Sequence, residues 1–164
     1  MIRYIGITSG FVNPLHSGHL DLIDGAIEKL GELSNYSFYQ ELYFIVNNDA
    51  QVKIKGSQPF MDENERLRII EHISGVDNAI LSIDKDGTVA ETIAKICELS
   101  LFSSDIECKF YFFKGGDRSD SSKMPQSELD VCNKYNIEIV YGCGGFNKAN
   151  SSSEILRKVR ENNV

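Results

Sequence analysis

Apolar runs and amphipathic segments alternate along almost the whole chain, and this alternation restricts the fold more than any other feature of the sequence. Apolar, strand-like runs lie at about residues 3–8, 42–46, 76–83, 109–113 and 137–141. Segments with helical periodicity begin after residues 16, 62, 88, 127 and 153. Strands that alternate with helices form a parallel sheet. We therefore predict an α/β fold, a doubly wound parallel five-stranded sheet with helices on both faces.

Length and composition are those of a single domain with a core of its own. The chain has 164 residues, of which 41% are hydrophobic and 25% are charged, so we expect one domain over residues 1–164. The formal net charge of −7 argues against a nucleic-acid partner, because nucleic-acid-binding domains usually present a basic face. The chain shows neither a signal-peptide pattern nor an apolar run near the roughly 18 residues that span a bilayer. We therefore expect no membrane association and a cytoplasmic location.

Four cysteines are spread through the second half of the chain without the spacing of a metal or redox motif. They are Cys97, Cys108, Cys132 and Cys143. With no C-x-x-C pair among them, they are expected to be buried or half-buried thiols. The sequence thus assigns no metal ion to side-chain ligands.

The stretch over residues 7–19 has the order strand, loop, helix. Gly10 removes a Cβ where a ligand can approach the backbone, and Pro14 fixes one φ angle before the helix. The start of a helix presents backbone N–H groups and the positive end of the dipole, so an anion suits this loop. His16 and His19 lie one turn apart and can both donate to phosphate oxygens. Spacing alone equally permits an ordinary turn followed by two histidines at a helix end.

The loop resembles the G-x-F-D-P-x-H-x-G-H signature of the cytidylyltransferase-like nucleotidyltransferases. The segment reads Ser9-Gly10-Phe11-Val12-Asn13-Pro14-Leu15-His16-Ser17-Gly18-His19. It matches H-x-G-H in full, whereas Asn13 stands where most members have aspartate. The resemblance implies a Rossmann-like fold, with His16 and His19 as catalytic residues and Asn13 at the substrate. It also implies nucleotide binding by Ser9, Gly10, Phe11 and Gly18.

Two further segments resemble the heptose-phosphate adenylyltransferases of this family. Val46-Asn47-Asn48-Asp49-Ala50 and Lys55-Gly56-Ser57-Gln58-Pro59 are similar to their V-N-S-D-A and K-G-x-x-R-P strings, although glutamine replaces the arginine. The second string implies a phosphate contact, and thus a catalytic role, for Lys55. Glu65-Arg66 matches a pair whose arginine faces the active site, which implies that Arg66 binds substrate. Without the resemblance, both cations would be ordinary solvated side chains.

A glycine-rich and a serine-rich segment complete the resemblance. Lys114-Gly115-Gly116-Asp117 is similar to the K-G-G-D string of the same enzymes, which implies nucleotide binding by Lys114, Gly115 and Asp117. Ser151-Ser152-Ser153 resembles the family's I-S-S-S/T motif, which implies that Ser151, Ser152 and Ser153 bind the β- and γ-phosphates. A tight turn and a helix cap are the structural alternatives for the two segments. Arg157 stands one position later than the motif arginine of relatives, so no role is carried over to it.

The resemblance implies transfer of a nucleoside monophosphate group from a nucleoside triphosphate to a phosphorylated small molecule, with release of pyrophosphate. We expect ATP as the donor, a heptose or other sugar 1-phosphate as the acceptor, and Mg²⁺ held mainly by the phosphates. The alternative is CTP with glycerol 3-phosphate or a related phospho-alcohol or phosphonate. Since members of this family are often dimers or larger, a homodimer is expected.

Two interpretations of another class stay open at this point. Asn13 and the displaced Arg157 would suit a non-catalytic nucleotide-sensing module that kept the fold. A fragment of an aminoacyl-tRNA synthetase would also carry an H-x-G-H loop, but the small size and the net charge of −7 argue against it. Pyrophosphate release distinguishes an enzyme from a sensor.

Overall fold

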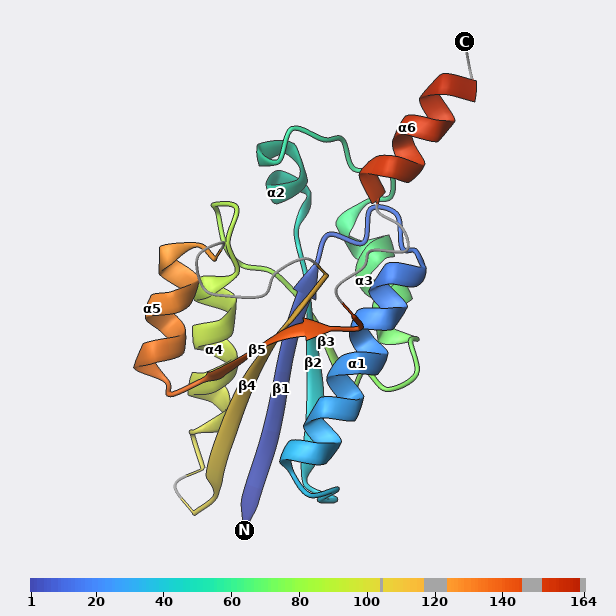
Figure 1. Ribbon diagram of the computed structural model, residues 1–164. Helices are drawn as coiled ribbons and strands as arrows, with labels where there is room; N and C mark the ends of the chain where they lie inside the picture. The colour runs from blue at the N-terminus through green and yellow to red at the C-terminus, as the bar shows by residue number, and fades with distance from the viewer. Residues whose placement is uncertain (104, 117–123, 146–151, 163–164) are drawn as a thin grey trace.

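The computed structural model describes residues 1–103, 105–116, 124–145 and 152–162 (Figure 1). In chain order the elements are β1 (Ile2–Gly10), α1 (Ser17–Leu33), β2 (Gln40–Val46), α2 (Asp49–Ile54), α3 (Glu63–Glu71), β3 (Asn78–Leu81), α4 (Ala90–Ser100), β4 (Glu107–Gly115), α5 (Gln126–Lys134), β5 (Glu138–Cys143) and α6 (Ser152–Asn162). The five predicted strands and five predicted helices are all present, with ends that differ by a few residues. α2 is the element that the sequence pattern does not predict, because six residues are too few to establish helical periodicity.

All five strands lie parallel in one sheet, in the order β3-β2-β1-β4-β5. The chain moves outward from β1 through β2 and β3, and then crosses to β4 and β5 on the other side. Figure 1 shows α1 and α3 on one face of the sheet and α4 and α5 on the other. The predicted doubly wound, Rossmann-like fold is therefore confirmed. In such sheets ligands bind beyond the carboxyl ends of the strands, where the strand order reverses, here between β1 and its neighbours.

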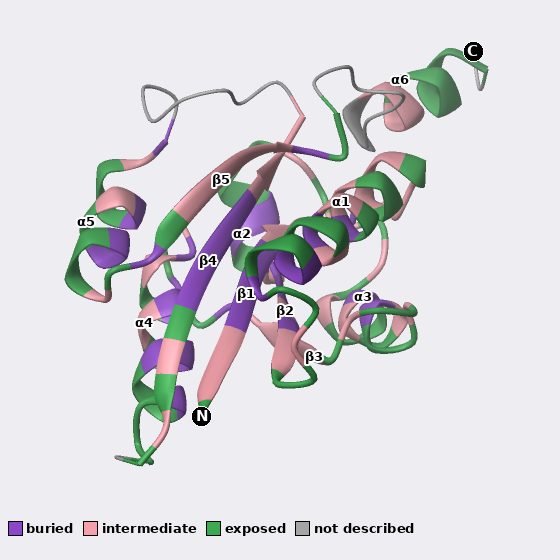
Figure 2. Cartoon of the chain, turned by 60° about the horizontal axis from the view of Figure 1, so that its bottom comes forward, coloured by how far each residue is buried: buried purple, intermediate pink, exposed green. Residues whose placement is uncertain are grey.

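The strands direct alternate side chains into two cores, as expected when both faces of a parallel sheet are covered. Ile5, Ile7 and Phe112 belong to the core on the side of α4 and α5, whereas Phe44 and Phe113 belong to the core on the side of α1 and α3. All five side chains are fully buried. Figure 2 shows the same burial along the middle of the central strands. The two cores thus hold β1 between them and fix the position of its carboxyl end.

Two glycines allow α1 to approach the end of β5 closely. A Cβ built on Gly25 of α1 would lie 2.3 Å from the backbone nitrogen of Gly144, and one built on Gly144 would lie 2.5 Å from the carbonyl oxygen of Asp21. Gly144 also has a φ of +79°, a conformation that glycine adopts without strain. This contact holds α1, whose first turn carries the histidine motif, against the sheet.

The four cysteines are free thiols, as predicted. Three of them, Cys97, Cys132 and Cys143, are buried. Burial raises the pKa of Cys97 to about 12 and the pKa values of Cys132 and Cys143 to about 11. These thiols are therefore neutral near pH 7 and poor nucleophiles.

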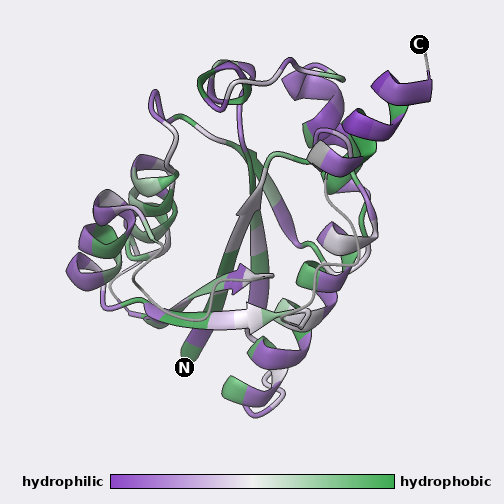
Figure 3. Cartoon of the chain, turned by 45° about the horizontal axis from the view of Figure 1, so that its top comes forward, coloured by the Kyte–Doolittle hydropathy of each residue, from purple (hydrophilic) through white to green (hydrophobic). Residues whose placement is uncertain are grey.

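α2 and α6 lie beyond the carboxyl ends of the strands (Figure 1). α6 is mostly hydrophilic along its length (Figure 3). Among the residues that the structure describes, no helix combines the length and the apolar character needed to cross a bilayer. α2 and α6 are therefore placed where they can cover a ligand at the crevice of the sheet.

Candidate active site

His16 and His19 cap the start of α1 with their own side chains. The Nδ1 atom of His16 accepts the backbone N–H of Gly18 at 3.0 Å, and Nδ1 of His19 accepts the backbone N–H of His16 at 3.1 Å. The two ring centroids are 3.9 Å apart. Because both Nδ1 atoms act as acceptors, each neutral ring carries its proton on Nε2. The pair thus provides two N–H donors at the positive end of a helix dipole, which suits a phosphate oxyanion.

The end of β1 lies against the second histidine. A Cβ built on Gly10 would lie 3.6 Å from the ring of His19 and 3.2 Å from the ring of Phe44. A larger residue at this position would crowd the aromatic ring of Phe44 and press on the histidine. Ser9 is held in the sheet opposite Ile45 of β2. The strand, the glycine and the histidine pair therefore form one packed unit.

A cavity of about 200 Å³ adjoins the loop after β1. Its walls come from that loop, from the end of α2 and from one face of α6. The lining residues are Phe11, Asn13, Val52, Lys55, Gly56, Ser57, Leu156 and Arg160. Lys55 is the C-cap residue of α2, and its ammonium lies 4.4 Å from the centroid of the Phe11 ring, a cation–π contact. The structure therefore brings together three predicted site residues, Phe11, Asn13 and Lys55.

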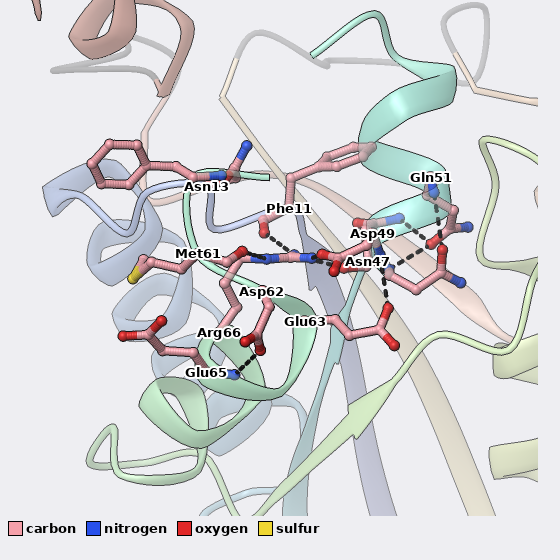
Figure 4. Close-up of polar contacts among 12 residues, drawn as sticks. Phe11, Asn13, Asn47, Asp49, Gln51, Met61, Asp62, Glu63, Glu65 and Arg66 are labelled. Atoms are coloured by element: carbon pink, nitrogen blue, oxygen red, sulfur yellow. Dashed lines mark hydrogen bonds and ion pairs between the residues drawn. The ribbon is translucent and has the colours of Figure 1, made fainter. Parts of the chain in front are cut away.

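Arg66, which the resemblance implies binds substrate, is engaged within the fold. The side chain is fully buried, and its guanidinium donates to the carbonyl oxygens of Phe11 at 2.7 Å, Asn47 at 2.6 Å and Met61 at 3.0 Å. The same group forms an ion pair with Asp49 at 2.7 Å (Figure 4). Arg66 thus joins the loop after β1, the end of β2 and the segment before α3. Its charge is balanced by Asp49 inside the protein, and a contact of Arg66 with substrate stays a prediction.

Asn13 is also engaged with the chain itself. Its side chain is buried, its amide N–H donates to the carbonyl oxygen of Gln58 at 2.9 Å, and its amide oxygen accepts the backbone N–H of Phe60 at 2.6 Å. These two bonds need a donor and an acceptor on one planar group, which an amide has and a carboxylate lacks. The amide in place of the family's aspartate therefore fits the local hydrogen bonding. It ties the loop after β1 to residues 58–60, and a contact of Asn13 with substrate stays a prediction.

Lys114 and Gly115 at the end of β4 contact other elements of the fold, the lysine through an ion pair and the glycine through close packing. The ammonium of Lys114 lies 3.4 Å from the carboxylate of Glu128 in α5, and the two side chains are only 11% and 5% exposed. It also lies 4.6 Å from the centroid of the Phe112 ring. A Cβ built on Gly115 would lie 2.9 Å from Cδ1 of Leu22 in α1, so this glycine allows close packing. Nucleotide binding by the two residues stays a prediction.

The structure describes two of the four remaining residues that were predicted to bind phosphate. Ser152 and Ser153 are the first two residues of α6. Asp117 and Ser151 lie outside the residues that the structure describes. The predicted contacts of these four residues with phosphate therefore stay predictions.

Sequence reasoning missed one wall of the cavity and one partner of the buried arginine. Leu156 and Arg160 of α6 line the cavity, and their i, i+4 spacing on one helix face was the available signal. Asp49, the ion-pair partner of Arg66, opens the short helix that the pattern does not predict. No local signal marks such a pair, because its members meet only in the folded chain.

A parallel sheet with a histidine pair at its first helix is the arrangement expected of a nucleotidyltransferase, and the comparison with known families agrees. The model of the family described as cytidylyltransferase-like matches residues 7–158, which include the histidine loop and most of α6. The chain belongs to this family. Enzymes of the family act on a nucleoside triphosphate and a phosphorylated small molecule. This membership favours an enzyme over a nucleotide-sensing module or a synthetase fragment.

Two FAD synthases and one solved structure are similar to this chain. The FAD synthase of Thermoplasma volcanium is 28% identical over 161 residues, which cover 98% of this chain and 96% of that protein. The FAD synthase of Thermoplasma acidophilum is 31% identical over 101 residues, 60% of this chain and 63% of that protein. The crystal structure of the lipopolysaccharide core biosynthesis protein from Thermoplasma volcanium matches with a TM-score of 0.57 and 22% identity, over 90% of this chain and 98% of that chain. This structural likeness supports the α/β fold.

Proposed function

We propose that this protein transfers the adenylyl group of ATP to the phosphate of FMN, forming FAD and releasing pyrophosphate. One observation carries the choice of acceptor: the similarity to an FAD synthase extends over 98% of this chain. FMN takes the place of the sugar 1-phosphate expected from short motifs, because strings of four or five residues match by chance more readily than a whole chain. The histidine pair at the start of α1 supports the chemistry of the transfer.

In this reaction an oxygen of the FMN phosphate attacks the α-phosphorus of ATP. A new bond forms between that oxygen and the α-phosphorus, the bond to the α,β-bridging oxygen breaks, and its electron pair leaves with pyrophosphate. Because the step needs little proton transfer, catalysis consists mainly of positioning and charge stabilisation. The Nε2–H groups of His16 and His19 stabilise the charge that develops on the α-phosphate and the bridging oxygen.

Cations and a helix N-terminus balance the charge of the two substrates in this proposal. Lys55 neutralises a phosphate group at the cavity, and the N-terminus of α6, with Ser152 and Ser153, suits the departing pyrophosphate. Within the described part of the chain, no group of three or more His, Cys, Asp and Glu side chains is arranged to hold a metal ion. The donors that we propose for Mg²⁺ are therefore phosphate oxygens and water, which this ion prefers at nucleotide sites. Bound Mg²⁺ withdraws negative charge from the phosphates.

A sugar 1-phosphate is the second candidate acceptor. It rests on residues 46–50 and 114–117, whose strings resemble those of the heptose-phosphate adenylyltransferases. CTP with glycerol 3-phosphate, or with a related phospho-alcohol or phosphonate, is the third combination, because the same scaffold serves both triphosphates. These combinations define the panel for the assay.

The test measures pyrophosphate release in the presence of Mg²⁺. ATP and CTP are crossed with FMN, sugar 1-phosphates that include a heptose 1-phosphate, and glycerol 3-phosphate. We expect release with ATP and FMN, together with FAD that chromatography separates from FMN. Release with another pair, and none with ATP and FMN, would overturn the proposed acceptor and leave the class of enzyme intact. A silent panel with intact ATP binding would overturn the proposal itself.

A further inference from the structure

One face of α6 forms a wall of the cavity beside the loop after β1. Leu156 and Arg160 are four residues apart, so their side chains lie on the same side of the helix, and both line the cavity together with Phe11 and Lys55. The other walls come from parts of the sequence about 100 to 150 residues earlier. α6 thus adds a cation to a site that the rest of the chain has already formed.

The lining of the cavity is positively charged in an acidic protein. Lys55 and Arg160 are the charged residues among the described residues that line it, and neither Asp nor Glu is part of this lining. The chain as a whole has a formal net charge of −7. A lining whose described charged residues are both cations favours an anionic ligand.

Arg157 on the same helix offers a direct contrast. Its guanidinium forms ion pairs with Glu154 and Glu161, so its charge is balanced within α6. Arg160 takes no part in the ion pairs found among the described residues. The two arginines, three positions apart, therefore have different surroundings. Arg157 is paired within α6, whereas Arg160 lines the cavity.

We propose that Arg160 binds a phosphate group of the substrates in this cavity, opposite Lys55. This inference rests on the proposed nucleotidyl transfer and names a further substrate-binding residue for it. A guanidinium matches two phosphate oxygens at once, whereas an ammonium acts as a point charge. A volume of about 200 Å³ is below the ~300 Å³ at which pockets for whole small molecules begin, so the cavity fits one end of a substrate. That end is either the distal phosphates of ATP or the phosphate of the acceptor.

The test compares Arg160→Gln with Arg157→Gln, two changes that keep a long helix-forming side chain on the same exposed helix. Isothermal titration measures the affinity of each protein for MgATP, pyrophosphate, FMN and inorganic phosphate. We expect Arg160→Gln to weaken at least one of these by about tenfold, the scale of a lost charged hydrogen bond. Arg157→Gln should stay within about twofold of the wild type, because its ion pairs are exposed.

The pattern of losses identifies the phosphate. A loss for MgATP and pyrophosphate assigns Arg160 to the triphosphate, and a loss confined to FMN and inorganic phosphate assigns it to the acceptor. Arg160→Lys keeps the positive charge but loses the guanidinium that can bind two phosphate oxygens at once. We therefore expect its affinity to lie between those of the wild type and Arg160→Gln. Equal affinities of Arg160→Gln and Arg157→Gln for all four ligands would overturn the inference. These titrations need no turnover, so they remain decisive even when the assay with FMN is negative.

Discussion

At the scale of single residues, the hydrogen bonds inside the protein determine which atoms are left for chemistry. The histidines use Nδ1 to cap α1, which places the proton of each neutral ring on Nε2. Asn13 uses both ends of its amide on the segment that follows α2. Arg66 donates from all three nitrogens of its guanidinium to partners within the protein. We therefore expect the two histidines to act on substrate, and Asn13 and Arg66 to position the loop that carries them.

His19→Ala tests the first group. The change removes a transition-state donor, so we expect kcat to fall by at least ~100-fold with the acceptor that the assay identifies. His72→Ala is the matched control, because His72 is an exposed residue at the C-cap of α3 that contacts the carbonyl of Arg68. Steady-state kinetics measure both variants. Near-normal turnover of His19→Ala would contradict the catalytic role.

Asn13→Asp tests the second group. At neutral pH the carboxylate cannot donate to the carbonyl oxygen of Gln58, so two buried acceptors face each other. We expect a higher KM and a free energy of unfolding that is lower by about 1–3 kcal/mol, the cost of an unsatisfied buried polar group. Protonation of the new side chain restores the donor, and burial favours the protonated form by raising its pKa. Activity relative to the wild type should therefore recover as the pH falls.

Asn13→Ala is the control for this pH dependence. It lacks both the donor and the titratable group, so its activity relative to the wild type should stay constant with pH. The ratio for each variant is measured from about pH 5 to pH 8, the range in which a carboxyl of raised pKa titrates. A flat ratio for Asn13→Asp would show that the missing donor is not the cause of the defect.

At the scale of elements, the sequence predicts what is encoded over neighbouring residues. The five strands and the long helices were predictable because their periodicity extends over many positions. The histidine motif was predictable because its residues are contiguous in the sequence and resemble a family signature. α2 is too short for such a signal. The role of Arg66 depends on partners up to 55 residues away, and the cavity depends on a helix at the other end of the chain. Contacts between residues so far apart in the sequence form only in the tertiary structure, so local sequence patterns do not predict them.

The contact between α1 and the end of β5 can be tested with Gly25→Ala. Alanine favours a helix over glycine by about 1 kcal/mol, but its Cβ would lie 2.3 Å from a backbone nitrogen. We expect the steric cost to exceed the gain in helix propensity, so that the free energy of unfolding, measured by urea titration, is lower by about 1–3 kcal/mol. Gly87→Ala is the control, because a Cβ there meets nothing within 4 Å. A Gly25→Ala protein as stable as this control would contradict the close approach.

At the scale of the whole molecule, buried thiols couple stability to alkaline pH. An unfolded chain exposes cysteines with a pKa of about 8.5, whereas burial raises the pKa of Cys97 to about 12 and those of Cys132 and Cys143 to about 11. Below about pH 8 both states keep these protons. At higher pH the unfolded chain binds fewer protons than the folded protein, so stability falls as the pH rises.

The homodimer expected from the family resemblance stays a prediction at the scale of the whole molecule.

We therefore expect the free energy of unfolding to fall between pH 7 and pH 10, and to fall less in Cys97→Ala, which lacks one of the raised thiols. Urea titrations of the two proteins at both pH values measure the difference. The alanine variant is less stable at each pH because it leaves a cavity, so the decisive quantity is the change with pH in each protein. Identical changes would exclude Cys97 as a source of the alkaline sensitivity.

The position of α6 has a consequence for how the enzyme comes into being. Among the described residues, the two cores take no buried residue from beyond Cys143, whereas the cavity needs Leu156 and Arg160. Synthesis on the ribosome runs from the N-terminus, so the sheet can be completed before the residues that close the cavity are translated. We expect a nascent chain extended to about residue 145 to fold around its sheet while its substrate site is still open, with catalytic competence arriving only once α6 has been translated.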